Sequence, residues 1–443
     1  MSQDAARAYW RFTVLWLFVG CALGTLAGLS LLTSGTIGHD PLPGYGRLVA
    51  AHRAVIIHGV LFSAMFGVCF TLLPRMNRAV MESGPISLFI ACFGTAVVII
   101  GTIGILIGLG SGREYADFPS VVGFVFWLYL LAVALDLGFQ IMRSKTFKLQ
   151  PSQGLLLTAA IIPAVVYPFG LPDWLGTGFF AALRTWIGWR TIFLVSFAVG
   201  AIGLSLWMPG KDERKKIIAR GPYIIGIILL IATAPFTGIV HLLDAPIPSG
   251  LKAWGAFAGG LSATAILLLV FTSWRKTSCD PPGFLFVAGL AGLAACAIQG
   301  AFMVVPPIHS ALHFTMNTSG HAHLALGSIL CVFLSGALVL APRLSRHELV
   351  EPEKAMPAAV LIVAGLGLIF FSMTSTGIVQ ATAMAGSSSG LLQTVRWIQL
   401  GTLAGGIAAL IGAAIIGVIV IKTLGFSMAT KRIAEPAPQV IET

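Results

Sequence analysis

Long apolar stretches recur along the whole chain, and they constrain its fold more than any other feature. A transmembrane helix needs about 20 apolar residues to cross a hydrocarbon core of about 30 Å. Applied along the 443 residues, this rule predicts an all-α, polytopic membrane protein with twelve transmembrane helices and short connections. The predicted helices are centred near Leu23, Phe62, Val98, Leu130, Ile161, Ala198, Leu229, Ala263, Leu293, Ile329, Ile369 and Ala409.

The composition excludes the common classes of soluble protein. Charged residues make up 10% of the chain, whereas soluble domains carry about 25%. The six cysteines are scattered and form no C-x-x-C pair, which argues against a disulfide framework, covalent haem attachment and an iron–sulfur or zinc site. The charge of +11 does not indicate a nucleic-acid partner, because in a membrane protein the location of basic residues matters more than their sum. We expect one membrane domain over residues 1–443, with a bundle from about residue 12 to 425 in the lipid bilayer.

Basic residues are distributed unevenly between alternate connections, and this asymmetry predicts the orientation. Cytoplasmic loops carry an excess of Lys and Arg. With twelve spans both termini share one side, and that side collects 20 of the 27 basic residues. We therefore expect both termini in the cytoplasm of a bacterial-type inner membrane. The basic residues on that side are Arg7, Arg11, Arg75, Arg78, Arg143, Lys145, Lys148, Lys211, Arg214, Lys215, Lys216, Arg220, Arg275, Lys276, Arg343, Arg346, Lys354, Lys422, Lys431 and Arg432.

Nine histidines are the main source of ligands, and a pair that opens the expected tenth helix is the most informative. His321 and His323 are two residues apart, so on an α-helix their side chains point roughly 200° from each other. Opposed imidazoles suit two planar cofactors on either side of one helix, and neutral imidazole is a usual axial ligand of haem iron. The alternative is a pair of histidines that are hydrogen-bonded to neighbouring helices.

His52 opens the expected second helix from the same side of the membrane as His323. The two residues would lie at similar depth and could hold one iron atom between them. His58 is about 240° further around the helix and roughly 9 Å deeper, so His52 and His58 cannot serve the same haem, and geometry alone does not choose between them. His39 and His347 are expected to be solvated surface groups in loops.

Six groups of residues along the chain form a recognisable pattern. They are Gly46-Arg47-Leu48 with His52 and Pro74-Arg75, Val240-His241-Leu242-Leu243 with Pro246 and Pro248, Ala297-Ile298-Gln299-Gly300, His313-Phe314-Thr315, Gly320-His321-Ala322-His323, and Thr394-Val395-Arg396. This pattern resembles subunit I of the haem–copper oxidase superfamily, and looks most like its cbb3-type cytochrome oxidase and nitric oxide reductase branch. The resemblance spans about residues 45 to 420 and implies the same twelve-helix layout.

The resemblance implies a cofactor role for each matching residue. His52 and His323 would be the axial ligands of a low-spin haem b, and His321 the proximal ligand of a second, high-spin haem. The spacing to Pro74 in this motif favours His52, which leaves His58 as a packed core histidine or an alternative ligand. One haem b is expected, and a second is compatible with the pattern. The other cofactor-binding residues implied are His313 and Arg396, near the haem propionates, and Arg47.

One part of the family pattern is missing. The family holds a second metal with three histidines, one on the sixth helix and an adjacent pair on the seventh. Here the sixth-helix position is expected at Trp189, the first of the pair is Val240, and only His241 remains. A lone imidazole cannot supply the three or so ligands of such a site, and tryptophan is a poor ligand. We therefore expect the copper-B centre to be absent, with His241 as its remnant.

These features favour a haem b-binding subunit of a respiratory-type electron-transfer complex that passes electrons through the bis-histidine haem without a copper-B centre. One alternative is the catalytic subunit of an O2 or NO reductase with an atypical distal metal site, so enzymatic activity stays open. Another is a transporter or structural homologue without haem. The expected partners are a c-type cytochrome or other electron-transfer subunits, with a quinol as an alternative donor. The haems are expected near the periplasmic side.

Overall fold

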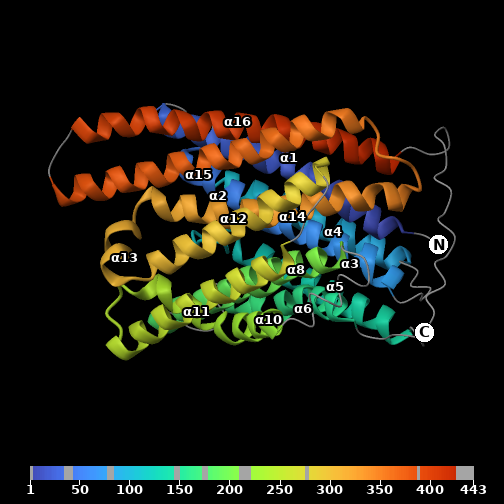
Figure 1. The fold of residues 1–443 in the computed structure, drawn as a ribbon, viewed down its shortest axis with the longest axis horizontal. Coiled ribbons are helices and arrows are strands. Elements are labelled where there is room, and N and C mark those ends of the chain that lie inside the picture. The colour runs from blue at the N-terminus through green and yellow to red at the C-terminus, as the bar shows by residue number, and fades with distance from the viewer. Residues whose placement is uncertain are drawn as a thin grey trace.

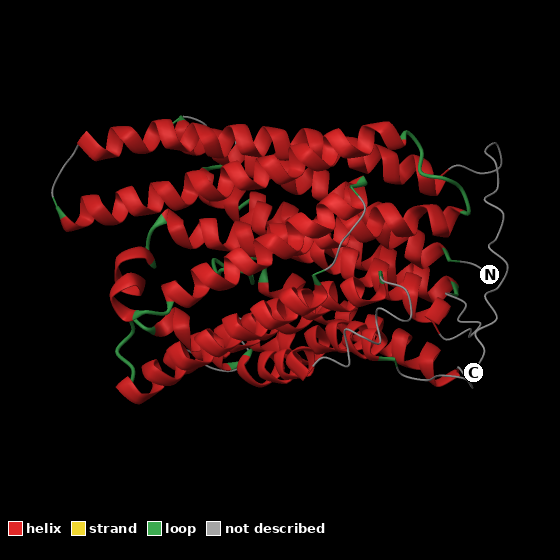
Figure 2. Ribbon diagram, viewed as in Figure 1, coloured by secondary structure: helices red, strands yellow, loops and turns green. Residues whose placement is uncertain are grey.

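The computed structural model describes residues 3–33, 43–76, 84–143, 150–171, 178–208, 221–274, 279–386 and 390–425. Figure 1 shows a bundle whose helices run mostly along its long axis, and the described part of the chain contains no strand (Figure 2). In these ranges eleven helices are long and apolar enough to cross a membrane, and a bent pair makes a twelfth when it is taken as one span. Each predicted centre lies within one of these spans, so the all-α, multi-span architecture is confirmed.

The helical elements follow one another in the order of the predicted spans. The first six spans comprise α1 (Asp4–Leu32), α2 (Tyr45–Ala54), the π-helix η1 (Val55–Leu61), α3 (Phe62–Met76), α4 (Pro85–Leu106), α5 (Ser120–Arg143), α6 (Pro151–Val166), the 3-10 helix η2 (Tyr167–Gly170), α7 (Phe179–Thr191), the π-helix η3 (Ile192–Ala198) and α8 (Val199–Trp207). The remaining elements are α10 (Gly221–Thr233), the 3-10 helix η4 (Phe236–Leu242), α11 (Ser249–Ser273), α12 (Pro281–Met303), α13 (Pro306–Leu312), α14 (Met316–Ser345), the 3-10 helix η5 (Pro352–Lys354), α15 (Ala355–Ala385) and α16 (Gly390–Gly425).

Three spans depart from a regular α-helix in their interior. The second span passes through η1 and the sixth through η3, and π segments of this kind occur frequently at functional sites. The seventh span bends by 53° between α10 and η4. Pro235 lies at this bend, where it cannot donate a backbone hydrogen bond and its ring clashes with the carbonyl four residues earlier. The bend tilts η4 and the residues that follow it relative to α10.

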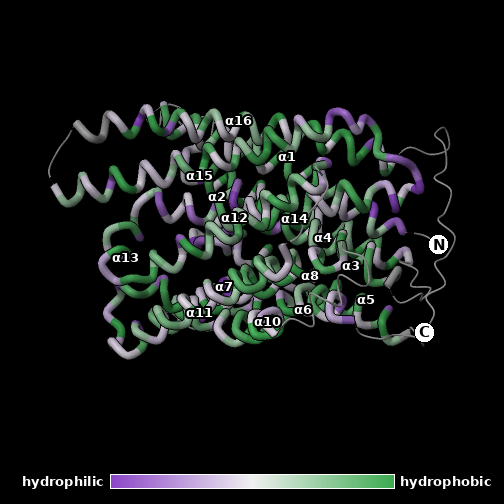
Figure 3. The backbone as a smooth tube through the Cα atoms, viewed as in Figure 1, coloured by the Kyte–Doolittle hydropathy of each residue, from purple (hydrophilic) through white to green (hydrophobic). Residues whose placement is uncertain are grey.

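The interior of the bundle is formed by the second, sixth and tenth spans, which are the most buried of the described spans. Outer helices turn apolar side chains away from the protein. On α4, for example, Ile100 and Ile103 are 59% and 53% exposed. Figure 3 shows apolar residues prevailing through the middle of the bundle, with hydrophilic segments more frequent toward its ends. Such a broad apolar surface is unfavourable in water and is expected of a protein that lipid surrounds.

The first and last helices pack side by side. The Arg11 guanidinium near the start of α1 donates to the Leu424 carbonyl at 3.3 Å, so the start of α1 and the end of α16 lie at the same end of the bundle. This arrangement agrees with an even number of spans. His39, residues 426–443 and the basic residues within 144–149, 209–220 and 275–278 lie outside the described residues, so the cytoplasmic location of the termini stays a prediction.

Helix α14, which carries His321 and His323, is fixed in position by close packing against α15. A side-chain carbon at Gly377 of α15 would overlap the backbone nitrogen of Asn317, so this approach requires glycine. The hydroxyl of Thr315 caps the helix by accepting a hydrogen bond from the Asn317 amide. Both contacts hold the first turn of α14, and they thereby position the histidines that follow.

Candidate haem site

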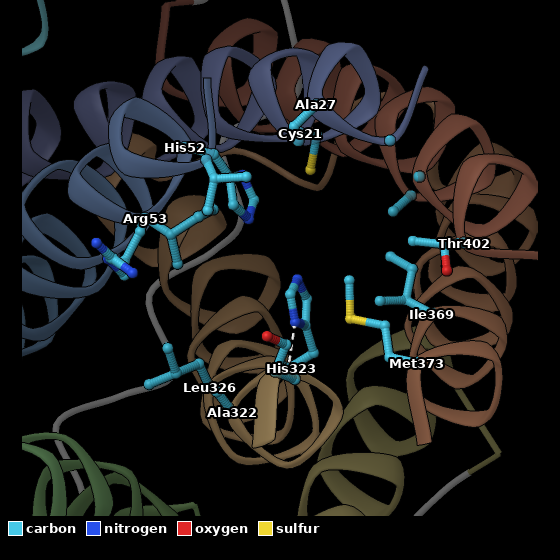
Figure 4. A pocket seen from close by; sticks show the side chains of 18 of the residues that line it. Cys21, Ala27, His52, Arg53, Ala322, His323, Leu326, Ile369, Met373 and Thr402 are labelled. Atoms are coloured by element: carbon cyan, nitrogen blue, oxygen red, sulfur yellow. Dashed lines mark hydrogen bonds between the residues drawn. The ribbon is translucent and has the colours of Figure 1, made fainter. Parts of the chain in front are cut away.

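His52 and His323 face each other across a cavity that is bounded by α1, α2, α14, α15 and α16 (Figure 4). Each is the eighth residue of its helix, so both helices begin earlier in the sequence than predicted. The two residues lie at the predicted similar depth. Their ring centroids are 5.9 Å apart and their planes differ by 12°. An imidazole nitrogen binds a metal ion at about 2 Å, so two rings that clamp one ion have centroids about 6 Å apart. The observed separation fits a shared metal atom.

Hydrogen bonds hold both imidazoles in the tautomer that binds metal through Nε2. His52 Nδ1 donates to the carbonyl of Gly20, and His323 Nδ1 donates to the carbonyl of Ser319, each at 2.8 Å. A carbonyl oxygen can only accept, so each Nδ1 carries the proton and each Nε2 keeps a lone pair. Metal-binding histidines usually donate their other ring N–H in this way. Both side chains are therefore prepared to act as metal ligands.

A glycine on α1 makes room for the His52 ring. A side-chain carbon at Gly24 would lie 2.8 Å from two ring atoms of His52, which is too close for a packed interior without movement of the ring. Gly20, one turn earlier, supplies the carbonyl that accepts from the same imidazole. No sequence pattern singles out either glycine, because their role depends on how α1 pairs with α2.

The walls of this first cavity are mainly apolar. The cavity encloses about 1350 Å³ including its open side, and its lining includes Leu31, Ile56, Leu330, Ile369 and Met373. A planar, largely apolar group with a metal at its centre would fit between the two imidazoles. Haem b has these properties, and axial histidine is among its common ligands. The residues that line the first cavity therefore fit a bis-histidine haem.

His321 lies on the other side of α14 and lines a second cavity of about 1020 Å³, measured in the same way. Its Nδ1 donates to Oε1 of Gln299 at 3.1 Å, which leaves the lone pair on Nε2, 3.8 Å from the sulfur of Cys296. His241 reaches the same cavity from η4. The H-x-H pair thus directs one histidine into each of two cavities, as expected for side chains about 200° apart on a helix. The identity of the group held in each cavity stays a prediction.

The second cavity contains an arginine in addition to its two histidines. The ring of His241 stacks on Trp186 with centroids 3.8 Å apart, and its Nε2 is buried without a hydrogen-bond partner. Arg190, one turn after Trp186, lines the cavity, and its Nε is also buried and unpartnered. A guanidinium is always protonated. The second cavity therefore presents positive charge, rather than three metal-binding imidazoles, on the side of His241.

Trp189, which was expected at the missing sixth-helix ligand position, lies away from the second cavity. Its ring packs against the ring of His58, with centroids 5.8 Å apart. Trp186, three residues earlier on α7, lines the cavity instead.

His58 is a packed core histidine, the first of its two predicted roles. Its Nδ1 donates to the Ala54 carbonyl at 3.1 Å, and the hydroxyl of Tyr167 donates to its Nε2 at 2.9 Å. The side chain is 2% exposed, and both ring nitrogens already have hydrogen-bond partners.

His347, in contrast, was wrongly predicted to be solvated. It is 8% exposed, because the left-handed backbone of Arg346 turns the chain back at the end of α14.

Three residues that were expected to contact the cofactor lie outside the lining of both cavities. Arg47 donates to the last carbonyl of α4 and Arg396 to the last carbonyl of α1, each at 3.5 Å. Nδ1 of His313 lies 3.1 Å from a carboxylate oxygen of Asp244. A contact between any of the three and a haem propionate stays a prediction.

Arg53 lines the first cavity beside His52, although no sequence pattern pointed to it. Its guanidinium makes a two-point contact with the carboxylate of Asp117, with Nε to Oδ2 at 2.8 Å, and a third contact with Glu114 at 3.4 Å. Burial raises the pKa of Asp117, and the hydrogen bond and charge of Arg53 oppose that rise. Between the two acids, Tyr115 has a left-handed φ of 65° and lines both cavities. The acids and their arginine are far apart in sequence, so no local pattern reveals this group.

Comparison with known proteins shows which family this chain resembles. The family described as cytochrome c and quinol oxidase polypeptide I matches residues 4–411. A cytochrome c oxidase subunit 1 homolog from Agrobacterium tumefaciens (strain T37) is 24% identical over 361 residues, covering 75% of this chain and 65% of the relative, so the chain spans just under two thirds of that protein. The cbb3-type cytochrome c oxidase subunit CcoN1 of Stutzerimonas stutzeri is 20% identical over 372 residues, covering 78% of this chain and 77% of the relative.

A solved structure of a heme-copper terminal oxidase dimer contains a similar chain. The two chains superpose with a TM-score of 0.79 at 15% sequence identity, over 98% of this chain and 86% of the other. At this identity the likeness establishes a shared fold. The family match, in contrast, extends over nearly the whole sequence. The chain therefore belongs to the cytochrome c and quinol oxidase polypeptide I family.

Proposed function

We propose that the chain is a haem b-binding membrane subunit of a respiratory-type electron-transfer complex. The observation that carries this proposal is the pair His52 and His323, whose Nε2 lone pairs face one cavity at a spacing suited to a single metal atom. When bound there, haem would supply a one-electron redox centre whose potential depends on its axial ligands and surroundings. The carbonyls of Gly20 and Ser319 would orient the imidazoles and raise their basicity. The apolar walls would limit access of water.

We further propose that His321 holds a second haem and that no copper-B centre forms opposite it. A metal of that kind needs three or so nitrogen ligands, and the described residues of the second cavity offer only His241 besides His321. The Trp186 indole covers one face of His241. The Arg190 guanidinium adds a positive charge that a neighbouring metal cation would have to approach, and this repulsion is strong in a weakly polar interior.

The expected cellular setting follows from the family and from the charge distribution. We propose a bacterial-type inner membrane location, with both termini in the cytoplasm and the haems toward the periplasmic side. The relatives are named as cytochrome c oxidase subunits, which supports a c-type cytochrome or another electron-transfer subunit as the partner. A quinol donor is the alternative.

The test is a reduced-minus-oxidised spectrum of the purified protein, with a pyridine haemochrome assay and elemental analysis. We expect haem b and no stoichiometric copper. His52→Ala and His323→Ala should each abolish the low-spin spectrum. His58→Ala serves as the control and should leave that spectrum intact, since both nitrogens of His58 already have protein partners. A colourless protein, or loss of the spectrum only in His58→Ala, would refute the assignment.

The metal content also decides between electron transfer and catalysis. One copper or non-haem iron for every two haems, together with a form that binds carbon monoxide, would support an O2 or NO reductase instead. Haem without a second metal in the second cavity would support the electron-transfer proposal.

A further inference from the structure

The second cavity contains one arginine whose charge no acidic side chain of the described residues offsets. Arg190 lies on α7, and its Nε is buried without a hydrogen-bond partner. The described residues that line this cavity include no aspartate and no glutamate, and the ion pairs of the described chain do not include Arg190. A guanidinium cannot lose its proton in a protein. The cavity therefore carries one positive charge.

The arginine of the first cavity shows the arrangement that Arg190 lacks. Arg53 contacts Asp117 at two points and Glu114 at a third, so two acids offset its charge. Removal of a charge from water without such a partner is strongly unfavourable. Ionisable side chains within membrane spans are for this reason almost always paired. The described residues supply no partner for Arg190, so we expect the counter-ion to come from solution.

We propose that Arg190 and His241 bind a small monovalent anion, such as chloride or nitrite, in the second cavity. A single unpaired guanidinium matches a single negative charge, and its N–H groups are donors without an acceptor role. His241 Nε2 is also buried without a partner. An imidazole that carries its proton on this atom would donate to the same anion. The proposal does not require a haem in the cavity.

The fold brings these two donors to one side of the cavity. Trp186 and Arg190 are four residues apart on α7, so their side chains lie on the same face of that helix. The ring of His241, from η4, stacks on the Trp186 indole with centroids 3.8 Å apart. Arg190 and His241 both line the cavity, and the shared contact with Trp186 holds them near each other.

The rest of the cavity strengthens the attraction for an anion. Most of its lining is apolar, including Leu293, Val304 and Ile329. Opposite charges attract each other more strongly in such weakly polar surroundings than in water. The cavity also has an open side, through which a small ion can enter.

The test is binding of radioactive chloride to the purified full chain by equilibrium dialysis, with gluconate as the only other anion in the buffer. The wild type should show one saturable site from which nitrite displaces chloride. Arg190→Gln should weaken chloride binding by at least about thirtyfold, as expected when one partner of a buried charge pair is lost. His241→Phe keeps an aromatic ring against Trp186 and should weaken binding by about tenfold, because it removes one hydrogen bond to a charged group.

Arg184→Gln is the matched control. Arg184 lies on the same helix but outside the lining of the second cavity, and it donates to the Phe169 carbonyl at 3.4 Å. This variant should bind chloride as the wild type does.

Thermal unfolding provides a second measurement. Chloride should raise the unfolding temperature of the wild type and of Arg184→Gln, because a ligand stabilises the state that binds it, and should not raise that of Arg190→Gln. In gluconate alone, Arg190→Gln should be at least as stable as the wild type, because it removes an unpaired buried charge. A variant that fails to fold is thereby recognised. The charge of Arg190 should also act most strongly on a redox centre in gluconate, where no small anion offsets it.

Three results would overturn the proposal. The first is a wild-type chain without saturable chloride binding, and the second is chloride binding that Arg190→Gln retains in full. The third is loss of a haem in Arg190→Gln from a chain that binds no chloride, which would mean that the guanidinium pairs with a haem carboxylate. Haem content is measured separately. Chloride binding by a haem-free chain would therefore contradict the proposed function and support this site.

Discussion

The two cavities on either side of α14 differ in how their histidines are held and in the charge around them. In the first cavity, two imidazoles face each other with their Nδ1 protons bound to backbone carbonyls and their Nε2 atoms free. In the second, only His321 has this arrangement, with Gln299 as its partner. The opposite wall there carries His241 stacked beneath Trp186, and the charged Arg190.

One helix therefore carries histidines into two differently built cavities. The two histidines on α14 are two residues apart, yet they serve separate surroundings, because the helix directs them to opposite sides. Changes on α7 and η4 therefore alter the second cavity without touching the first. The first cavity depends instead on α1 and α2, which supply Gly20, Gly24 and His52.

The largest expected effect comes from two variants that should each remove the haem of one cavity only. His321→Ala should remove one haem of two and leave the low-spin spectrum in place, whereas His323→Ala should remove the low-spin haem and spare the other. The physical reason is that the side chains project to different cavities. Haem per protein and the electron paramagnetic resonance spectrum measure both outcomes. Loss of both haems in either single variant would mean that the two cavities form one site, which would contradict this comparison.

Much of this comparison could be predicted from the sequence, and the reason is periodicity. Apolar stretches of about 20 residues determine the spans, and the two-residue spacing of His321 and His323 determines their opposite directions. Trp186 and not Trp189 lines the second cavity, and no apolar pattern reveals which of the two tryptophans faces it. Arg53, Arg190 and Gly24 were missed because their roles depend on contacts between helices that are distant in sequence.

The next effect concerns the ion pair at the rim of the first cavity. Asp117→Asn should lower the free energy of unfolding by about 1.5–3 kcal/mol, the usual contribution of a hydrogen bond to a charged group. Glu114→Gln is the control, since that side chain is 47% exposed and exposed pairs contribute about 0–1 kcal/mol. Thermal unfolding in detergent measures both. Equal losses of unfolding free energy in the two variants would show that the buried Asp117 contact is no stronger than the exposed Glu114 contact.

A smaller effect is expected where α1 approaches His52. Gly24→Ala would push a methyl group against the imidazole and should weaken retention of the low-spin haem by about 10–100-fold, as changes next to a metal ligand do. Transfer of haem to excess apomyoglobin measures this. Gly417→Ala is the control at another α1 contact, because its nearest neighbour, Val14, would be 3.7 Å away. Similar transfer rates in both variants would contradict the proposed role of Gly24.

The smallest effect tests whether Arg190 supplies the positive charge of the second cavity. A unit charge about 10 Å from a redox centre contributes on the order of 1–2 kcal/mol at an effective dielectric constant near 20. Arg190→Gln removes that charge and should therefore lower the midpoint potential of the His321 haem by about 60 mV, a tenfold change in a one-electron equilibrium. Arg190→Lys keeps the charge and should leave the potential nearly unchanged. Because Arg190 lines only the second cavity, the low-spin haem should shift much less in redox titrations of either variant. Equal shifts of both haems, or a shift in Arg190→Lys as large as in Arg190→Gln, would mean that the two cavities do not differ in charge as proposed.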